Sequence, residues 1–176
     1  QGSGFRVQGS EGKEQTLEVG DQQLAISDQQ SFGLTSIILV MHNQLKYTKL
    51  CMESIERHTS EPYELIVVDN RSTDGSVEWF KTVGKAVEDR GREQRSEGNG
   101  PVRVRVVANT ENRGFPAAAN QGIRAAAGKQ VVLLNNDTLV TAGWLSRLVR
   151  ALHSDPTLGM VGPVSNFVSG QQQVAA

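Results

Sequence analysis

The stretch VVLLNNDT, residues 131–138, joins a run of four apolar residues directly to four polar ones. A second stretch, LIVVDN at residues 65–70, changes in the same way. Short, continuous apolar runs of this kind predict buried strands of a parallel sheet. Ligands of open α/β sheets bind beyond the carboxyl ends of the strands, and Asp69 and Asp137 follow those ends. A lone carboxylate flanked by amides suits a hard divalent cation that also binds phosphates, so a nucleoside-diphosphate site is predicted.

Strand and helix patterns alternate along the rest of the chain, which predicts an α/β fold with a mostly parallel sheet flanked by helices. Alternating Val and Arg in the third strand indicates an edge with one solvated face. The fourth strand is expected to be central. The predicted strands are 35–41, 65–68, 102–107, 131–134 and 160–164, and the predicted helices are 45–58, 77–87, 116–127 and 142–153.

Two polar segments interrupt this pattern. Residues 1–34 are rich in Gly, Gln, Ser and Glu, and we interpret them as a linker or tail that holds at most a short strand or two. Residues 88–101 are charged and contain glycine, so an exposed loop is predicted. The folded domain would then span residues 35–176, with its sheet truncated at the C-terminus.

Length and composition exclude several classes of function. The chain has 176 residues and a formal net charge of -1, which predicts no binding to nucleic acid. It contains one cysteine, Cys51, whose place in a helical pattern indicates a buried small side chain. We find no signal peptide and no transmembrane segment in the sequence, and expect a cytoplasmic protein, with any contact to the inner face of a membrane made by a longer parent protein.

Four motifs resemble those of the inverting family 2 glycosyltransferases with the GT-A (Rossmann-like) fold. They are VVDNRSTDGS at 67–76, NRGFPAAANQGI at 112–123, LLNNDT at 133–138 and TAGWLSRLV at 141–149. Each motif is weak alone, but their order and spacing are specific. The resemblance covers residues 35–164 and implies the nucleotide-sugar-binding half of such an enzyme.

The resemblance implies a role for each candidate residue at the strand ends. Asp69 would accept a hydrogen bond from the pyrimidine base, although an Asx-turn or helix cap is the alternative. His42 stands where the family often has Tyr and would stack on the base, or be a surface histidine. Asn70 is interpreted as a turn former and Asn43 as a cap of the first helix. Asp74 suits the cap of the second helix.

Residues around the diphosphate are implied by the other motifs. Asp137 would bind Mg²⁺ or Mn²⁺, which neutralises charge on the leaving nucleoside diphosphate. Asn135 and Asn136 replace what is often a first carboxylate, so modest metal affinity is expected. Arg113 and Gly114 would meet phosphate. Asn120, within the motif NRGFPAAANQGI, would reach the base or the diphosphate. The alternative interpretation is that Asn120 is a surface residue of a helix.

An inverting transferase also needs a general base, which the family carries well downstream of the metal-binding aspartate. The only carboxylate after Asp137 is Asp155, followed by Pro156, so the base is expected outside this chain. The expected function is sugar transfer from a nucleotide-diphospho-sugar to a glycan, lipid-linked or protein acceptor, as in polysaccharide biosynthesis. The alternatives are a non-catalytic nucleotide-sugar-binding or scaffolding module and, less favoured because the first loop lacks glycine, a nucleotidyltransferase.

Overall fold

A computed structural model describes residues 32–93, 101 and 103–163. Within them, four parallel strands form one sheet in the order β3-β2-β1-β4. The strands are β1 (Thr35–Met41), β2 (Tyr63–Asp69), β3 (Arg103–Ala108) and β4 (Gln130–Asn135), and the helices are α1 (Leu45–His58), α2 (Ser76–Glu93), α3 (Phe115–Ala125) and α4 (Trp144–His153). The predicted α/β fold is confirmed. None of the described helices is long and apolar enough to cross a membrane.

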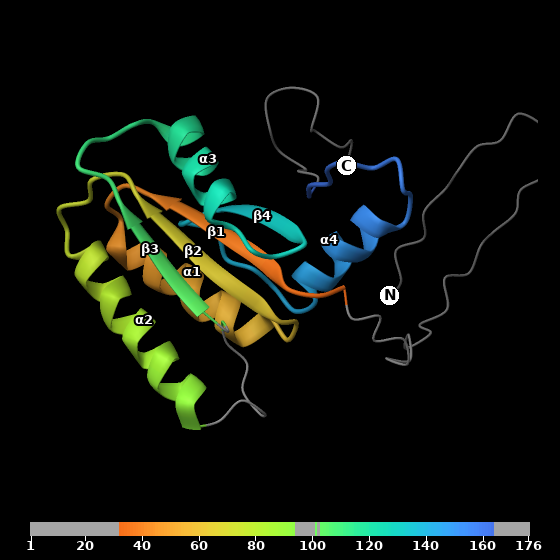
Figure 1. The fold of residues 1–176 in the computed structure, drawn as a ribbon, viewed down its shortest axis with the longest axis horizontal. Coiled ribbons are helices and arrows are strands. Elements are labelled where there is room, and N and C mark those ends of the chain that lie inside the picture. Colours follow the sequence, from red (N-terminus) through yellow and green to blue (C-terminus); the bar gives the residue numbers. More distant parts are fainter. Residues whose placement is uncertain (1–31, 94–100, 102, 164–176) are drawn as a thin grey trace, which may run out of the picture. The chain divides into compact units, whose positions relative to one another are not determined.

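Helices cover both faces of the sheet, with α3 over one face and α1 and α2 over the other (Figure 1). The two faces follow from the period of two along each strand. Ile37 and Leu39 of β1 face α1 and pack in a cluster with Ile55 and Phe80. Ile38, between them, faces α3 and packs in a second, smaller cluster.

Close packing against α3 depends on one glycine. A Cβ atom built on Gly122 would lie 2.4 Å from Cγ2 of Ile38 and 3.3 Å from Cγ2 of Val68. Because real Cβ contacts are never as short as the first distance, the helix approaches the sheet this closely only with glycine at the contact. The buried Ala118 and Ala119 belong to the same face of α3, so the small side chains of this helix serve its packing on the sheet.

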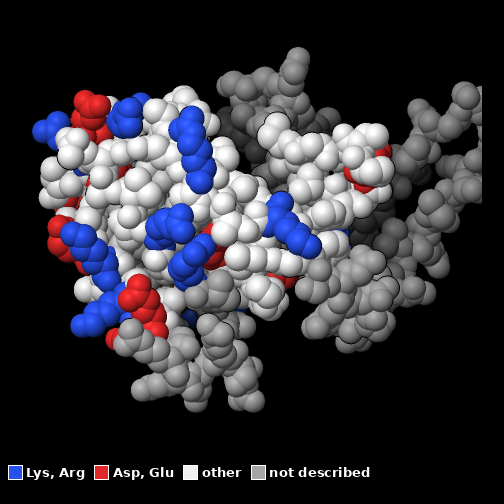
Figure 2. Space-filling view, in the orientation of Figure 1, with Lys and Arg blue, Asp and Glu red and all other residues white. Residues whose placement is uncertain are grey.

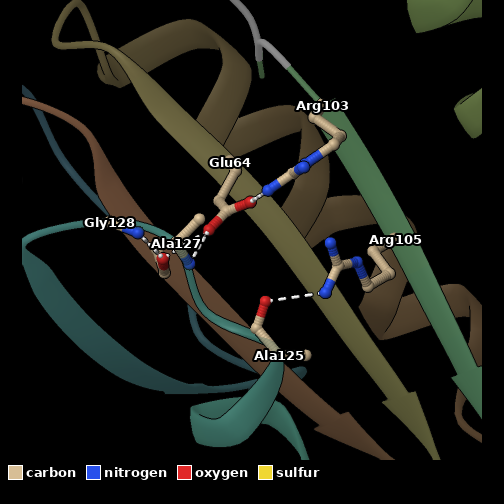
Figure 3. A network of polar contacts seen from close by, with 7 residues as sticks. Glu64, Arg103, Arg105, Ala125, Ala127 and Gly128 are labelled. Atoms are coloured by element: carbon tan, nitrogen blue, oxygen red, sulfur yellow. Dashed lines mark hydrogen bonds and ion pairs between the residues drawn. The ribbon is translucent and has the colours of Figure 1, made fainter.

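A buried carboxylate ties the C-terminal end of α3 to the sheet (Figure 3). Glu64 is 1% exposed and accepts hydrogen bonds from the Ser36 hydroxyl, the Arg103 guanidinium and the backbone N–H of Ala127. Burial alone would raise its pKa, but these donors outweigh burial and lower the pKa from 4.5 to about 2. Arg105 donates to the carbonyl of Ala125 at 2.8 Å, where the helix dipole favours a cation.

Several boundaries differ from the sequence-based expectations. Helix α2 continues to Glu93, so the prediction of a loop was wrong for residues 88–93. The strand predicted at 160–164 was also wrong where the chain is described, because residues 160–163 are irregular and Met160 is 86% exposed. Strand β4, expected to be central, has β1 on one side and no second neighbour among the described residues.

The third strand is an edge strand, as predicted. Val104 and Val106 pack against the larger cluster, while Arg103 and Arg105 point to the other face. Basic and acidic side chains are interspersed on the face seen in Figure 2. The short strands expected within residues 1–31, and Val164, lie outside the described residues.

Candidate functional site

The carboxyl ends of β1, β2 and β4 stand level at one edge of the sheet. Met41 pairs with Asp69, and Val40 pairs with Asn135. The strands are parallel and β1 lies between the other two, so Asp69 and Asp137 follow strand ends on either side of it. The edge predicted as a site therefore gathers the loops that follow all three strands.

The carboxylate of Asp69 closes a turn. Both of its oxygens accept the backbone N–H of Ser72, at 3.2 and 3.0 Å, and the residue is 1% exposed. The bond spans three residues, so it is neither the two-residue Asx-turn nor a cap of α2, which begins at Ser76. An ionised carboxylate has further lone pairs beyond those used here. A nucleobase that bound to Asp69 would therefore share the carboxylate with the N–H of Ser72.

The ring of His42 is oriented by the strand next to it. Its Nδ1 lies 2.8 Å from the carbonyl oxygen of Asn70. Since a carbonyl only accepts hydrogen bonds, Nδ1 carries the proton in this contact. The side chain is exposed at the candidate edge, so a face of the imidazole is available to a ligand.

Asn70 was interpreted as a turn former, and the structure gives it a larger part. Its side-chain oxygen accepts hydrogen bonds from Asn109 Nδ2 and from the backbone N–H of Arg113, both at 3.1 Å. The residue is 3% exposed. Sequence reasoning missed this role because the donors lie 39 and 43 residues away. The one available signal was its position directly after Asp69 at a strand end.

The prediction that Asn43 caps α1 was wrong. The first N–H of that helix, from Leu45, is accepted by Oδ2 of Asp74 at 2.8 Å. Asp74 also accepts the backbone N–H and hydroxyl of Ser76 at the start of α2, so one carboxylate caps two helices. Asn43 instead accepts the N–H of Thr73 at 2.8 Å and takes a left-handed φ of 60°.

The loop after β4 contains one carboxylate and two amides in different surroundings. Asn136 donates to the Thr48 hydroxyl at 2.9 Å, which fastens the loop to α1. Asn135 is exposed, and its carbonyl oxygen lies 3.7 Å from the sulfur of Cys51. Asp137 is exposed and forms no hydrogen bond or ion pair with the described residues, so its carboxylate is available to a ligand.

Cys51 is buried, as predicted. Burial, with the nearby Asp137 charge adding to it, raises the pKa of its thiol to about 11. A thiol with so high a pKa is a poor nucleophile at neutral pH. The side chain therefore serves packing rather than chemistry.

The loop before α3 presents backbone to the same edge. Gly114 has φ 77° and ψ 163°, a conformation open to glycine alone. Helix α3 begins at the next residue with Pro116 in its first turn and no acidic side chain there, so its N-terminal dipole is uncompensated. Arg113 is exposed, and its Nε lies 3.9 Å from a carboxylate oxygen of Glu111. Asn120 is exposed on α3 and has no hydrogen bond to the other candidates.

In the part of the chain that the structure describes, no three His, Cys, Asp or Glu side chains form a cluster that could hold a metal ion. At the end of β4, the oxygen donors are the carboxylate of Asp137 and the amides of Asn135 and Asn136 beside it. Such a set fits a hard cation that takes most of its ligands from phosphate and water, and it does not fit a metal held by protein alone.

Comparisons with known proteins agree with this geometry. Residues 36–173 match the model of glycosyl transferase family 2. The chain is 33% identical over 145 residues to the uncharacterized protein y4gI of Sinorhizobium fredii, which covers 81% of the chain and 14% of that protein. It is 27% identical over 134 residues to the glycosyltransferase GlyG of Streptococcus pneumoniae, and this match covers 76% of the chain and 40% of GlyG.

A solved structure supports the same fold. The mannosyltransferase PcManGT of Pyrobaculum calidifontis, in complex with GDP-Man and Mn2+, superposes with a TM-score of 0.59 at 26% identity and covers 71% of this chain and 33% of its own. The chain thus spans well under half the length of the relatives it matches. Its parallel sheet, its helices and its match to the family model together place the chain in glycosyl transferase family 2, with the GT-A fold.

Proposed function

We propose that this chain is the donor-binding half of a glycosyltransferase that moves a sugar from a nucleotide-diphospho-sugar to an acceptor with inversion. The observation that carries the proposal is the position of Asp69 and Asp137 at one edge of the sheet, on either side of β1. A nucleoside diphosphate laid along that edge would meet the first residue with its base and the second with its phosphates.

The base end would be formed by Asp69 and His42. A pyrimidine N–H would donate to the carboxylate, and the exposed imidazole would stack on the ring. The fixed orientation of His42, held by the Asn70 carbonyl at 2.8 Å, supports this assignment because the ring needs no reordering to receive a base.

The diphosphate end would be formed by Asp137, Arg113 and Gly114. A bound Mg²⁺ or Mn²⁺ would lower the charge on the leaving diphosphate, with Asp137 as its protein ligand and Asn135 and Asn136 beside it. The N-terminus of α3, with Gly114 allowing close backbone approach, favours an anion there. Asn120, exposed on the same helix, would reach the base or diphosphate. The Mn2+ in the solved mannosyltransferase supports a metal in the family.

The general base would come from outside this chain. After Asp137 the only carboxylate is Asp155, and Thr157 holds it in an exposed turn by two hydrogen bonds of 2.8 and 2.7 Å. That turn follows α4 and not a strand end, which supports the proposal that Asp155 is not the base. The acceptor would be a glycan, a lipid-linked glycan or a protein, as in polysaccharide biosynthesis.

The position of Asp155 also supports a second candidate function. Without a base, the chain would bind a nucleotide sugar and serve as a non-catalytic binding or scaffolding module of a larger protein. The two functions are separated by sugar transfer, since both require donor binding.

The test combines binding with transfer. Titration calorimetry of the chain with UDP, dTDP and GDP, with and without Mn²⁺, should show metal-dependent binding of at least one of them. Incubation with nucleotide sugars and acceptors should show transfer by the longer parent protein and none by residues 1–176. Asp155→Ala is the control and should change neither result. Failure of both proteins to bind any nucleotide would refute the proposal, and binding without transfer by the parent would favour the scaffolding module.

A further inference from the structure

The side chain of Asn70 is the junction between the two ends of the candidate site. It is almost fully buried, at 3% exposure, although it stands at the end of β2 where ligands are expected. Its Oδ1 accepts two hydrogen bonds of 3.1 Å, one from the Asn109 side chain and one from the backbone N–H of Arg113. The loop that leads into α3 is therefore fastened to β2 through a single amide oxygen.

A reciprocal amide pair extends the junction into α3. Asn109 Nδ2 donates to Gln121 Oε1 and Gln121 Nε2 donates to Asn109 Oδ1, each at 2.9 Å. The backbone N–H of Asn109 also donates to the Asp69 carbonyl at 2.9 Å. The segment between β3 and α3 is thus held to the end of β2 at its start, through Asn109, and near its end, through Arg113.

The backbone of Asn70 reaches the other way, toward β1. Its N–H donates to the Met41 carbonyl at 2.8 Å, and its own carbonyl oxygen lies 2.8 Å from Nδ1 of His42. One residue therefore contacts the histidine at the base end through its backbone and the arginine at the diphosphate end through its side chain.

We propose that Asn70 is a positioning residue that fixes the diphosphate end of the donor site relative to the base end, acting through Asn109 and Gln121. The proposal rests on the proposed function, because the two ends are defined by donor binding. Removal of the Asn70 amide leaves the Arg113 N–H and one of the two Asn109 amide hydrogens without an acceptor, so the end of the loop next to α3 loses its tie to β2. The start of the loop keeps the bond from the Asn109 N–H to Asp69 and the amide pair with Gln121. The base end keeps its contacts, because they involve only the backbone of Asn70.

The first experiment measures positioning without any ligand. In Asn70→Ala, amide exchange of Arg113 should become about tenfold faster, since its acceptor is gone. Exchange of Ile66 in the middle of β2 should stay unchanged. Asn70→Asp keeps a side-chain oxygen at the same position and should restore slow exchange. Unchanged exchange of Arg113 in Asn70→Ala would overturn the proposal.

The second experiment measures binding of UDP and GDP in the presence of Mn²⁺, and of uridine and guanosine by ligand-observed NMR. Asn70→Ala should lower affinity for the nucleoside diphosphate by about tenfold, and affinity for the nucleoside by less than about twofold. A role in stability alone would lower both equally, and that result would overturn the proposal. Asn70→Asp should bind the diphosphate within about threefold of wild type.

Two further variants complete the test. Asn109→Ala leaves the Arg113 contact intact but breaks the amide pair, so an intermediate loss is expected, and it replaces Asn70→Ala if that variant does not fold. Arg124→Gln changes an exposed side chain on α3 and should leave binding unchanged. Wild type that binds neither nucleotide would refute the proposed function, whereas wild-type binding that persists in both amide variants would refute the positioning role alone.

Discussion

A carboxylate oxygen of Asp74 lies 2.8 Å from the backbone nitrogen of Leu45 and accepts its N–H. The loop after β2 therefore caps the helix that follows β1, and it does so from 29 residues away. The same side chain accepts the N–H of Ser76 at 3.2 Å at the start of α2. Two helices that point at the candidate edge thus begin on one shared cap.

Asp74→Ala should lower the free energy of unfolding by about 2 kcal/mol, since each lost cap is worth about 1 kcal/mol. Urea unfolding followed by circular dichroism measures this. Glu53→Ala removes an exposed carboxylate of α1 that caps no helix, and it should change stability by less than about 0.5 kcal/mol. Equal losses in the two variants would argue against the shared cap.

Stability should fall in acid because of Glu64. Its pKa is lowered from 4.5 to about 2, so its contribution is full above pH 4.5 and is lost as the pH falls toward 2. A shift of this size corresponds to about 3 kcal/mol, which solvent around the half-exposed Arg103 reduces to about 2 kcal/mol. Unfolding measured from pH 7 to pH 2 should show this decline.

Glu64→Gln is the matched variant for that experiment. Glutamine keeps the size of the side chain but presents an NH₂ group to donors, so stability at pH 7 should fall by about 2 kcal/mol. Its stability should also depend less on pH between 4.5 and 2 than that of wild type. An identical acid dependence in both proteins would show that other carboxylates cause the decline.

Two glycine-to-alanine substitutions should change the free energy of unfolding in opposite directions. At Gly122 the new Cβ would lie 2.4 Å from Ile38, so Gly122→Ala should destabilise by about 1–3 kcal/mol. At Gly84 in α2 the nearest atom is a Cβ of Val104 at 3.9 Å, and Gly84→Ala should stabilise by about 0.5–1 kcal/mol. Thermal unfolding of both variants gives the comparison. Stabilisation by both changes would mean that α3 does not contact β1 this closely.

The metal-dependent part of nucleotide binding should depend on Asp137. Asp137→Ala should lower the affinity for UDP or GDP in the presence of Mn²⁺ by about tenfold or more, because one contact to a charged group is lost. Asp137→Asn should lower this affinity less. Calorimetry with and without Mn²⁺ separates the metal-dependent part. Affinity that is the same in wild type and Asp137→Ala would exclude Asp137 as the metal ligand.

The strands were predictable because their apolar runs are short and end abruptly. Residues 35–41 and the start and end of α1 agree with prediction because burial decides them. The extension of α2 to Glu93 was missed because residues 88–93 contain no apolar side chain and include Gly91, a poor helix former, so neither periodicity nor propensity predicts a helix there. The strand expected near Met160 failed because Gly162 and Pro163 interrupt its apolar run, and both residues are disfavoured inside a strand.

The position of a candidate residue was predictable where that residue lies at a strand end, whereas its contacts were not predictable where they involve a distant partner. The place of Asp69 and Asp137 at the sheet edge could be predicted because polar side chains after apolar runs stand out in a single sequence. The role of Asn70 depends on Asn109, which the pairing of Asp69 with Ala108 brings alongside it. Nothing local to residue 70 encodes that pairing.

The strand order has a consequence for how the protein is made. Strand β1 is made before the other described strands and lies between β2 and β4 in the finished sheet. The elements α1, β2, α2, β3 and α3 are all made before β4. A three-stranded sheet formed before β4 is made would therefore leave open the edge of β1, a strand that is buried along nearly all its length in the finished fold. Because unpaired edges of this kind can recruit strands of other chains, pairing of β4 with β1 would remove a site of aggregation from the growing domain.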